Sequence, residues 1–155
     1  MQSNNTPLVS VIINCFNGEK YIREAIDSML SQTYKNWELI FWDNQSTDRS
    51  AEIFQDYDDD RFKYYYSDKF TQLGEARNFA IKKSKGELIG FLDADDIWLS
   101  DKLEMQVPVF NDEKVGICIC DSYFFNETGV IKQIYKKNKP PNGMVFKELL
   151  GRYFI

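Results

Sequence analysis

Short apolar segments alternate with amphipathic segments along most of the chain, and this alternation limits the folds open to it. The apolar segments predict buried β-strands at residues 8–13, 38–42, 62–66, 88–92 and 115–120. The segments between them predict helices at residues 17–33, after a cap at Ser46 or Thr47, at residues 74–84, and from residue 100 until Pro108 disturbs the helix. This order predicts an α/β fold, with a mainly parallel sheet flanked by helices on both faces. A length of 155 residues suits one domain.

The composition excludes several kinds of chemistry. The sequence contains no histidine, which removes His-ligated zinc sites, His general bases and the Ser-His-Asp and Cys-His nucleophile arrangements within this chain. The net charge of −5 disfavours sequence-independent nucleic-acid binding, so we expect no nucleic-acid partner. An odd number of cysteines predicts no disulfide framework. Cys118 and Cys120 are expected to be buried in the strand at residues 115–120, with a CxC metal or redox pair as the alternative.

Polar side chains follow the predicted strands at the points where the strands end. In parallel α/β sheets, ligands bind outside the carboxyl ends of the strands. The polar residues at these positions are Asn14, Asn17, Asp43, Asp93, Asp95 and Asp96. The fold is therefore expected to gather them at one edge, although Asn17 also suits the N-cap of the first helix.

Asp93 and Asp95 are the strongest candidates for metal binding. In extended backbone, residues two apart project to one side, so both carboxylates can face one cation while Ala94 turns away. Such oxygen ligands suit Mg²⁺ or Mn²⁺, which complete their coordination with substrate phosphates and water. The alternative is an acidic turn in which Asp95 or Asp96 caps a short helical turn. Three crowded carboxylates favour the metal, because like charges repel one another.

Three further residues each have a binding and a structural interpretation. Asp43 can accept hydrogen bonds from a base or a ribose, or can form an Asx-turn in the segment DNQSTD. Arg77 can bind a diphosphate, or can pair at the surface with Glu75 or Asp68. Phe16 can stack on a base, or can anchor a loop or the core.

The segment from residue 132 to residue 141 is basic and contains proline, which predicts a loop. Its lysines can attract acidic lipid headgroups or can simply be solvated; they are Lys132, Lys136, Lys137 and Lys139. Neither a GxGxxG fingerprint nor a Walker-type GxxxxGK[ST] motif is present. Phosphate is therefore expected to be held by a metal and an arginine rather than by a glycine-rich loop.

Two long stretches of the sequence resemble a known family. VSVIINCFNGEKYIREAIDSMLSQTYKNWELIFWDNQSTDRS and LGEARNFAIKKSKGELIGFLDADDIW are similar to the family-2 glycosyltransferases of the GT-A fold, with four blocks in the same order. The resemblance is dense over residues 8–125 and looser over residues 143–155. It implies an inverting transferase that uses nucleotide-diphosphate sugars and Mn²⁺ or Mg²⁺.

The resemblance also implies roles for single residues. Asn14, Phe16 and Asn17 would line the nucleoside pocket, and Asp43 would contact the base, typically uracil. Arg77 would face the diphosphate, Asp93 would contact the ribose or the sugar-phosphate region, and Asp95, with Asp93, would hold the metal. The sequence departs from the family pattern at Asn44 and Gln45, where Asp-Gly is common. This departure bears on the loop geometry and on the choice of nucleotide.

For the whole chain, the resemblance implies the donor-binding half of one glycosyltransferase domain over residues 1–155. Residues 1–7 would be a flexible N-terminus, and residues 132–155 a loop and the start of the acceptor-side region. The fold would be incomplete at the C-terminus, with the general base downstream. We expect transfer from a UDP-sugar to a saccharide or lipid-linked acceptor in cell-surface polysaccharide synthesis. The setting would be cytoplasmic, with peripheral contact at the inner face of the membrane and no anchor in this chain.

Two alternatives remain open. A haloacid-dehalogenase-like phosphatase also places Asp-x-Asp and Mg²⁺ after an apolar strand. That signature usually opens the chain and continues with a small residue or Thr, whereas Asp96, Ile97 and Trp98 follow here. The other alternative is a module that binds a nucleotide without catalysis.

Overall fold

The computed structural model describes residues 6–126, 128–136, 140 and 142–145. The chain divides into two compact units, Met1–Val109 and Phe110–Ile155, which are described separately below. Most of the predicted flexible N-terminus lies outside the described residues, but its last two residues are held in place. Thr6 O accepts a hydrogen bond from Asn36 Nδ2 (2.6 Å), and Pro7 O accepts one from the Tyr34 hydroxyl (2.5 Å).

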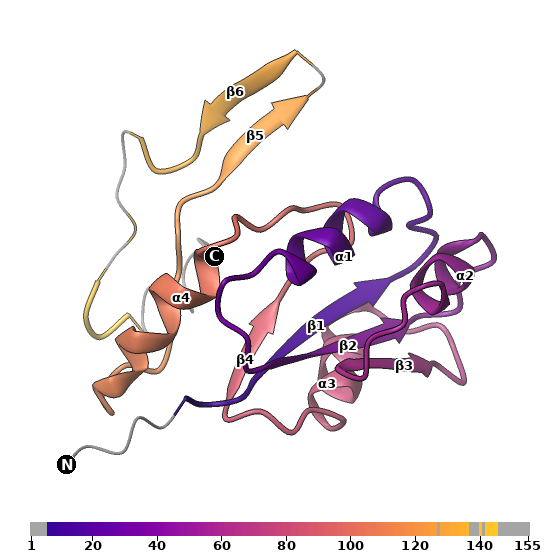
Figure 1. Ribbon diagram of the computed structural model, residues 1–155, viewed down its shortest axis with the longest axis horizontal. Coiled ribbons are helices and arrows are strands. Elements are labelled where there is room, and N and C mark those ends of the chain that lie inside the picture. The colour runs from indigo at the N-terminus through magenta and orange to yellow at the C-terminus, as the bar shows by residue number, and fades with distance from the viewer. Residues whose placement is uncertain (1–5, 127, 137–139, 141, 146–155) are drawn as a thin grey trace. The chain divides into compact units, whose positions relative to one another are not determined.

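A four-stranded parallel sheet forms the centre of the first unit (Figure 1). Its strands, in the order β3-β2-β1-β4, are β1 (Val9–Cys15), β2 (Trp37–Asp43), β3 (Phe62–Tyr66) and β4 (Leu88–Phe91). The predicted bounds of β3 match the observed ones. The predicted ends of the other three strands lie within two residues of the observed ends. The parallel arrangement places the carboxyl ends of all four strands at one edge.

Helices follow the strands, as predicted. They are α1 (Ile22–Leu30), α2 (Ser50–Gln55), α3 (Leu73–Ile81) and α4 (Lys102–Gln106), and a 3₁₀ turn (Val107–Asn111) contains Pro108. Neither Ser46 nor Thr47 caps α2, because that helix begins only after Arg49. Asn17 does not cap α1, because that helix begins five residues later, after Tyr21. The side chains of Asn17 and Ser46 instead form hydrogen bonds that join the loop after β1 to the loop after β2.

Helices cover both faces of the sheet, which confirms the predicted fold class. One core cluster joins alternate residues of β1 to α1, α2 and α4; it includes Val9, Val11, Ile13, Ile26, Phe54 and Leu103. The other joins Ile12 and two β2 residues to Ala76 and Ala80 of α3. The strict alternation along β1 therefore divides its side chains between two helical layers.

The second unit corrects two of the predictions. Residues 115–120 form no strand, and the strands there are β5 (Tyr123–Asn126) and β6 (Gly129–Gln133), an antiparallel hairpin. Cys120 is exposed and Cys118 only half-buried, so neither is a buried strand residue. An alternating sequence becomes a strand only where a neighbouring strand pairs with it, and within the described range none pairs with residues 115–120. Because β6 runs to Gln133, the predicted loop begins after that residue.

Within the described residues, no helix combines the length and the apolar character that crossing a bilayer requires.

Candidate functional site

The carboxyl edge of the sheet brings together the ends of strands that are far apart in the sequence. Cys15, Asp43 and Tyr66 end β1, β2 and β3, and they are paired in register across the sheet. On the other side of β1, the Leu92 N–H donates to Ile12 O (3.0 Å) and extends the ladder past β4. Asp93 therefore leaves β4 beside the end of β1, as the sequence predicted.

Arg77 and Asp93 form an ion pair at this edge. Arg77, on α3, donates through Nη2 to Asp93 Oδ1 at 2.7 Å, and its guanidinium lies 5.0 Å from the centre of the Phe91 ring. Arg77 thus pairs with Asp93 rather than with Glu75 or Asp68, the two surface partners considered for it, and Glu75 pairs with Lys69 at 3.6 Å. The structure therefore places the predicted diphosphate-binding arginine against the first residue of the acidic segment.

The acidic segment after β4 is a turn rather than an extended strand. The Asp96 N–H donates to Asp93 O (3.1 Å), which corrects the extended geometry assumed from the sequence. Ala94 packs against the core, so it does turn away from the carboxylates as predicted. Desolvation raises the pKa of Asp96 above its usual range, and repulsion by Asp93 and Asp95 raises it further. The negative charges of Asp93 and Asp95 therefore both act on the carboxyl group of Asp96.

The donor set of this turn suits a divalent cation shared with a phosphate ligand. Asp93 and Asp95 are exposed and offer hard oxygen atoms, which Mg²⁺ and Mn²⁺ prefer. In the part of the chain that the structure describes, no group of three or more acidic or cysteine side chains is placed to hold a metal ion. The side chains thus fit a site that a phosphate and water complete, and do not form a cage made of protein alone.

A buried glutamine supports the segment that follows the acidic turn. Gln32, at the end of α1, is fully buried; its Nε2 donates to Leu99 O (2.8 Å) and its Oε1 accepts from Leu103 N (3.1 Å). The Thr33 N–H donates to Ser100 O (2.8 Å). The sequence analysis did not identify Gln32. The feature that could have indicated it is a glutamine placed just after an amphipathic helix.

Asp43 is fully buried and both of its oxygens are bonded. Oδ1 accepts from the Ser46 N–H (2.7 Å) and Oδ2 accepts from the Tyr64 hydroxyl (2.8 Å). Burial, and then the bond to Asp43, raise the pKa of Tyr64 well above its usual value. This geometry supports the structural interpretation of Asp43, a loop-forming aspartate. Its contact with a base stays a prediction.

The loops after β1 and β2 are bonded to each other by their side chains. Asn17, with a φ of 55°, donates its N–H to Ser46 Oγ (3.0 Å), and its Oδ1 accepts from Thr47 N (2.8 Å). The Gly18 N–H donates to Ser50 Oγ (2.9 Å), and the Glu19 N–H donates to Asp48 Oδ2 (2.9 Å).

Two further hydrogen bonds join the same two loops. The Arg49 N–H donates to Glu19 Oε2, and the Asn44 N–H donates to Cys15 O. The sequence predicted Asn17 as a site residue but missed its partners.

Two other predicted residues lie where β1 ends. Asn14 is half-buried, and its Nδ2 has no hydrogen-bond partner. Phe16 is 52% exposed and packs edge-on against Phe70, whose ring centre is 4.9 Å away. Phe70 precedes α3 and was missed by sequence reasoning, although an aromatic residue in a polar loop was the signal for it. The structure thus leaves an unsatisfied donor and two exposed rings at the carboxyl edge.

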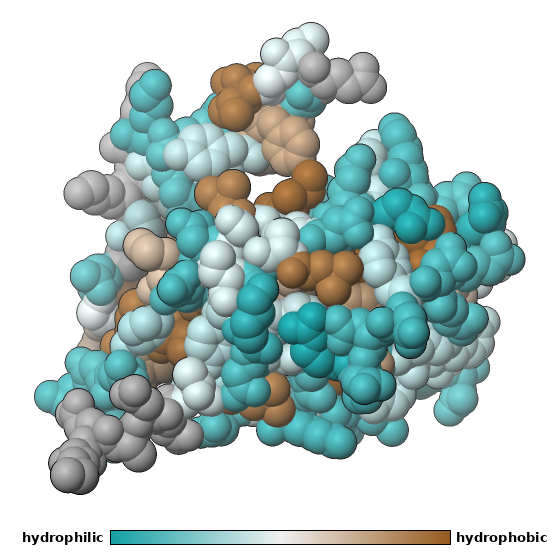
Figure 2. All heavy atoms as spheres, viewed as in Figure 1, coloured by the Kyte–Doolittle hydropathy of each residue, from teal (hydrophilic) through white to brown (hydrophobic). Residues whose placement is uncertain are grey.

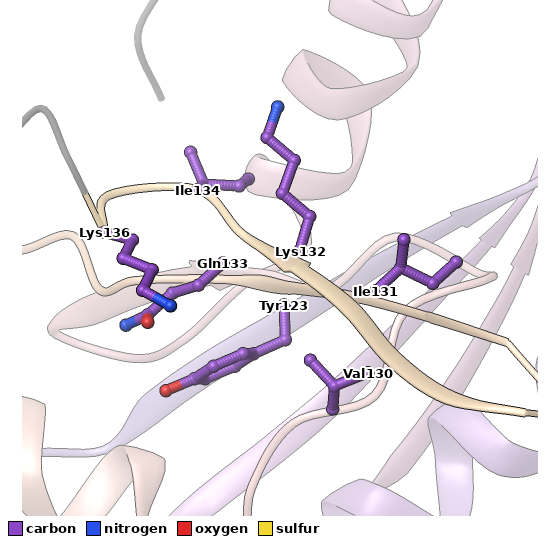
Figure 3. Close-up of a pocket in the computed structure, with 7 residues that line it drawn as sticks. All are labelled: Tyr123, Val130, Ile131, Lys132, Gln133, Ile134 and Lys136. Carbon is purple, nitrogen blue, oxygen red and sulfur yellow. The ribbon is translucent and has the colours of Figure 1, made fainter.

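A separate hollow lies in the second unit, beside the hairpin (Figure 3). It is lined by Tyr123, Val130, Ile131, Lys132, Gln133, Ile134 and Lys136. Tyr123 and Val130 point to one side of the hairpin, whereas Lys132 and Ile134 point to the other. None of the residues predicted to bind the nucleotide-sugar or the metal lines this hollow, whereas two of the lysines considered for lipid binding, Lys132 and Lys136, do.

Comparison with known proteins places the chain in a family. The model of a family described as "Glycosyl transferase family 2" matches residues 10–153. The chain is 33% identical to the Escherichia coli UDP-Glc:alpha-D-GlcNAc-diphosphoundecaprenol beta-1,3-glucosyltransferase WfgD, over 85% of this chain and 52% of that protein. It is 39% identical to the putative teichuronic acid biosynthesis glycosyltransferase TuaG of Bacillus subtilis, over 68% of this chain and 42% of that protein. The chain thus spans about half the length of these relatives, or less.

Solved structures agree with this assignment. A mannosyltransferase from Pyrobaculum calidifontis, in complex with GDP-Man and Mn²⁺, superposes with a TM-score of 0.68 at 26% identity, covering 73% of this chain and 35% of the other. TarS of S. aureus, in complex with UDP-GlcNAc, superposes with a TM-score of 0.64 at 28% identity, covering 77% of this chain and 38% of the other. These similarities confirm the predicted GT-A fold, and together with the family match they show that the chain belongs to glycosyl transferase family 2.

Proposed function

We propose that this chain is the donor-binding part of an inverting glycosyltransferase. It would transfer a sugar from a UDP-sugar to a saccharide or lipid-linked acceptor in cell-surface polysaccharide synthesis. The observation that carries the proposal is the 2.7 Å pair of Arg77 and Asp93 at the carboxyl edge, with Asp95 two residues further on. The Arg77 guanidinium on the crossover before β4, together with the carboxylates in the turn after β4, suits a diphosphate that shares a metal with the protein.

The relatives support this choice of substrates. WfgD is named for UDP-Glc and for an acceptor linked to diphosphoundecaprenol, and TuaG is named for teichuronic acid biosynthesis. TarS has been solved with UDP-GlcNAc, and the mannosyltransferase with GDP-Man and Mn²⁺. WfgD and TarS are both named with UDP-sugars, which favours uridine as the nucleoside. The sequence led to the same expectation.

Each residue at the edge has a role in this proposal. Asp95, with Asp93, would hold Mn²⁺ or Mg²⁺, which when bound supplies Lewis-acid stabilisation of the diphosphate charge. Arg77 would donate to the diphosphate oxygens and stabilise the negative charge that develops as the sugar departs. Asn14 and Phe16 would line the nucleoside pocket, together with Asn17 and Asp43.

The reaction is a single displacement at the anomeric carbon. The acceptor hydroxyl attacks from the face opposite the nucleotide and forms the new C–O bond, while the bond to the diphosphate breaks and its electron pair stays on the diphosphate. A carboxylate general base removes the hydroxyl proton. We assign no residue of this chain to that base.

Calorimetric titration of the chain with UDP and Mn²⁺ tests the proposal. We expect Asp95→Ala to abolish Mn²⁺-dependent UDP binding, because it removes an exposed metal ligand. Asp60→Ala is the matched control, an exposed aspartate in the turn before β3. Equal binding by both variants would show that the acidic turn does not hold the metal.

A nucleotide-binding module without catalysis is the second candidate function, because the residues that carry the proposal, Arg77 and Asp93, would bind the donor and neither is assigned as the general base. Binding of UDP without hydrolysis or transfer of UDP-sugars would favour it. The family match gives the phosphatase interpretation no support.

We also propose that the protein works at the cytoplasmic face of the membrane. The hairpin exposes Tyr123, Phe124, Val130 and Ile131, and Figure 2 shows hydrophobic side chains on its surface. Lys132 contacts Phe124, with Nζ 5.9 Å from the ring centre, and Lys136 follows; Lys137 and Lys139 lie outside the described residues. Apolar and basic side chains together suit an anionic lipid surface. Co-sedimentation with phosphatidylglycerol vesicles, but not with phosphatidylcholine vesicles, is the expected result.

A further inference from the structure

We infer that Phe70 and Phe16 form an aromatic corner that receives the nucleobase, and that Asn44 is the positioning residue that keeps Phe70 in place. This inference rests on the proposed function, because the base belongs to the nucleotide-sugar donor. It adds Phe70 and Asn44 to the residues that the sequence singled out for the nucleoside.

The two rings meet at an angle and leave their outer surfaces open. Their centres are 4.9 Å apart, their planes are inclined by 67°, and each residue is 52% exposed. A planar base can stack on the face of one ring while its rim contacts the other ring. Burial of these exposed faces by a base is favourable, because stacking on an aromatic side chain stabilises bound nucleotides.

Phe16 is held by the bonds between the loops on either side of it. Its neighbour Cys15 accepts a hydrogen bond from Asn44 N (2.8 Å), and its other neighbour, Asn17, donates its N–H to Ser46 Oγ (3.0 Å). The backbone of Phe16 is therefore fixed on both sides by the loop that follows β2.

Phe70 is held by the same loop, through the side chain of Asn44. Asn44 is 6% exposed; its Nδ2 donates to Thr71 O (2.8 Å), and its Oδ1 accepts from both Thr71 N and Thr71 Oγ1 (3.1 Å each). Gln45 adds a bond from Nε2 to Asp68 O (3.0 Å). These contacts hold Thr71 and Asp68, which lie on either side of Phe70 in the chain. Asn44 and Gln45, the two residues that depart from the family pattern, therefore fix the position of the Phe70 ring.

Phe70 lies on the crossover between β3 and β4, which also carries Arg77, the residue proposed to bind the diphosphate. Phe70 precedes α3, and Arg77 lies on α3 with its side chain paired to Asp93. One crossover thus supplies a ring for the base and a cation for the diphosphate. This order along the chain matches the two parts of a nucleoside diphosphate.

Titration with UDP and with inorganic pyrophosphate, each with Mn²⁺, tests the inference, because pyrophosphate has no base. We expect Phe70→Ala to weaken UDP binding by about tenfold or more and to leave pyrophosphate binding within about twofold of the unchanged chain. Phe16→Ala should behave in the same way. Tyr21→Ala is the matched control: its ring is exposed, lies outside the corner and is contacted by Lys20, and its removal should change neither affinity.

A double-substitution cycle tests the positioning role of Asn44. We expect Asn44→Ala to weaken UDP binding in the unchanged chain but to have little further effect in the Phe70→Ala background, because its role is exerted through that ring. Thr71→Val removes only the hydroxyl donor to Asn44 and provides a milder variant should Asn44→Ala unfold. An equal loss in both backgrounds would overturn the positioning role.

The outcomes separate this inference from the proposed function. If the unchanged chain binds UDP and pyrophosphate with Mn²⁺, but Phe70→Ala binds UDP equally well, the aromatic corner is wrong and the proposed function stands. If the unchanged chain binds neither ligand, the proposed function fails and the corner fails with it.

Discussion

Arg77 donates a hydrogen bond of 2.7 Å to the carboxylate of Asp93, and this contact joins helix α3 to the segment that follows β4. The two residues are 16 positions apart in the sequence. Their side chains are 26% and 54% exposed, so both can reach a bound anion or cation without unfolding the edge. The pair therefore compensates part of the negative charge of the acidic turn before any ligand arrives.

The first prediction concerns this pair. We expect Arg77→Met to weaken binding of UDP with Mn²⁺ by about tenfold or more, because the charge-assisted bond proposed between Arg77 and the diphosphate would be lost. The free energy of unfolding should fall by less than about 1 kcal/mol, since partly exposed ion pairs contribute little to stability. Calorimetry and urea unfolding measure the two effects. Lys69→Met breaks the exposed pair with Glu75 and is the control; if it weakens UDP binding as much, the effect of Arg77 is only one of net charge.

The second prediction concerns two glycines in different surroundings. A Cβ at Gly86 would lie 2.5 Å from Ser10 N and 2.6 Å from Leu8 O, so Gly86→Ala forces backbone atoms apart. We expect it to lower the free energy of unfolding by about 3 kcal/mol or more. Gly74, in α3, has no atom within 4 Å of such a Cβ apart from its chain neighbours and the nearby backbone of its own helix, and Gly74→Ala should stabilise the chain by up to about 1 kcal/mol. Urea unfolding of both variants tests this contrast; similar effects of the two would contradict the described packing at Gly86.

The third prediction concerns pH. The Arg61 guanidinium donates two bonds to Asp59, at 2.9 and 2.6 Å, and lowers the pKa of that carboxyl group below its usual value. Because the pKa is lower in the folded chain than in the unfolded chain, ionised Asp59 stabilises the fold above about pH 4, and this contribution is lost as the pH falls through the folded-state pKa. We expect Asp59→Asn to lower the free energy of unfolding at neutral pH by about 1–2 kcal/mol.

Urea unfolding between neutral pH and the acid range measures this effect. The difference between Asp59→Asn and the unchanged chain should shrink as the pH falls below the usual aspartate range. Asp60→Asn, at the exposed neighbouring aspartate, should leave the stability nearly unchanged. A difference for Asp59→Asn that is independent of pH would show that the ion pair is not its cause.

The fourth prediction concerns the cysteines. Cys120 is exposed, Cys118 is half-buried, and Cys15 is buried at the end of β1, where burial raises the pKa of its thiol. A thiol reagent should therefore modify Cys120 first and Cys118 next, while Cys15 reacts only in denaturant. Mass spectrometry of partly modified chains gives the order. Early modification of Cys15 would show that the loops after β1 and β2 open in the native state.

The sheet could be predicted because its signal is local. The strand at residues 62–66 is set off by the turn at Asp58 to Asp60, and the apolar runs of the other strands end at polar residues that mark the carboxyl edge. The position of Asp93 at the carboxyl edge followed from the rule that parallel strands end at one edge, but its pairing with Arg77 was not predicted. The strand predicted at residues 115–120 was wrong, because its apolar pattern has no partner strand in the described chain.

The details of the site could not be predicted, because they depend on bonds between distant residues. The loops after β1 and β2 are joined by side chain to backbone bonds across about 30 positions. Asn44 reaches Thr71 across 27 positions, and Gln32 reaches Leu99 across 67. A single sequence names the polar residues but not which of several possible acceptors each one meets. Phe70 was missed for the same reason, since only its contact with Phe16 distinguishes it from other loop aromatics.

The loop after β2 carries neither ring of the aromatic corner, but its residues form hydrogen bonds beside both of them. A randomised library confined to Asn44, Gln45 and Ser46 would change side chains that bond beside the two rings, and neither of the side chains that pair Arg77 with Asp93. Such a library would vary recognition of the base independently of recognition of the phosphates, so that altered nucleotide preference could be selected without rebuilding the transferase.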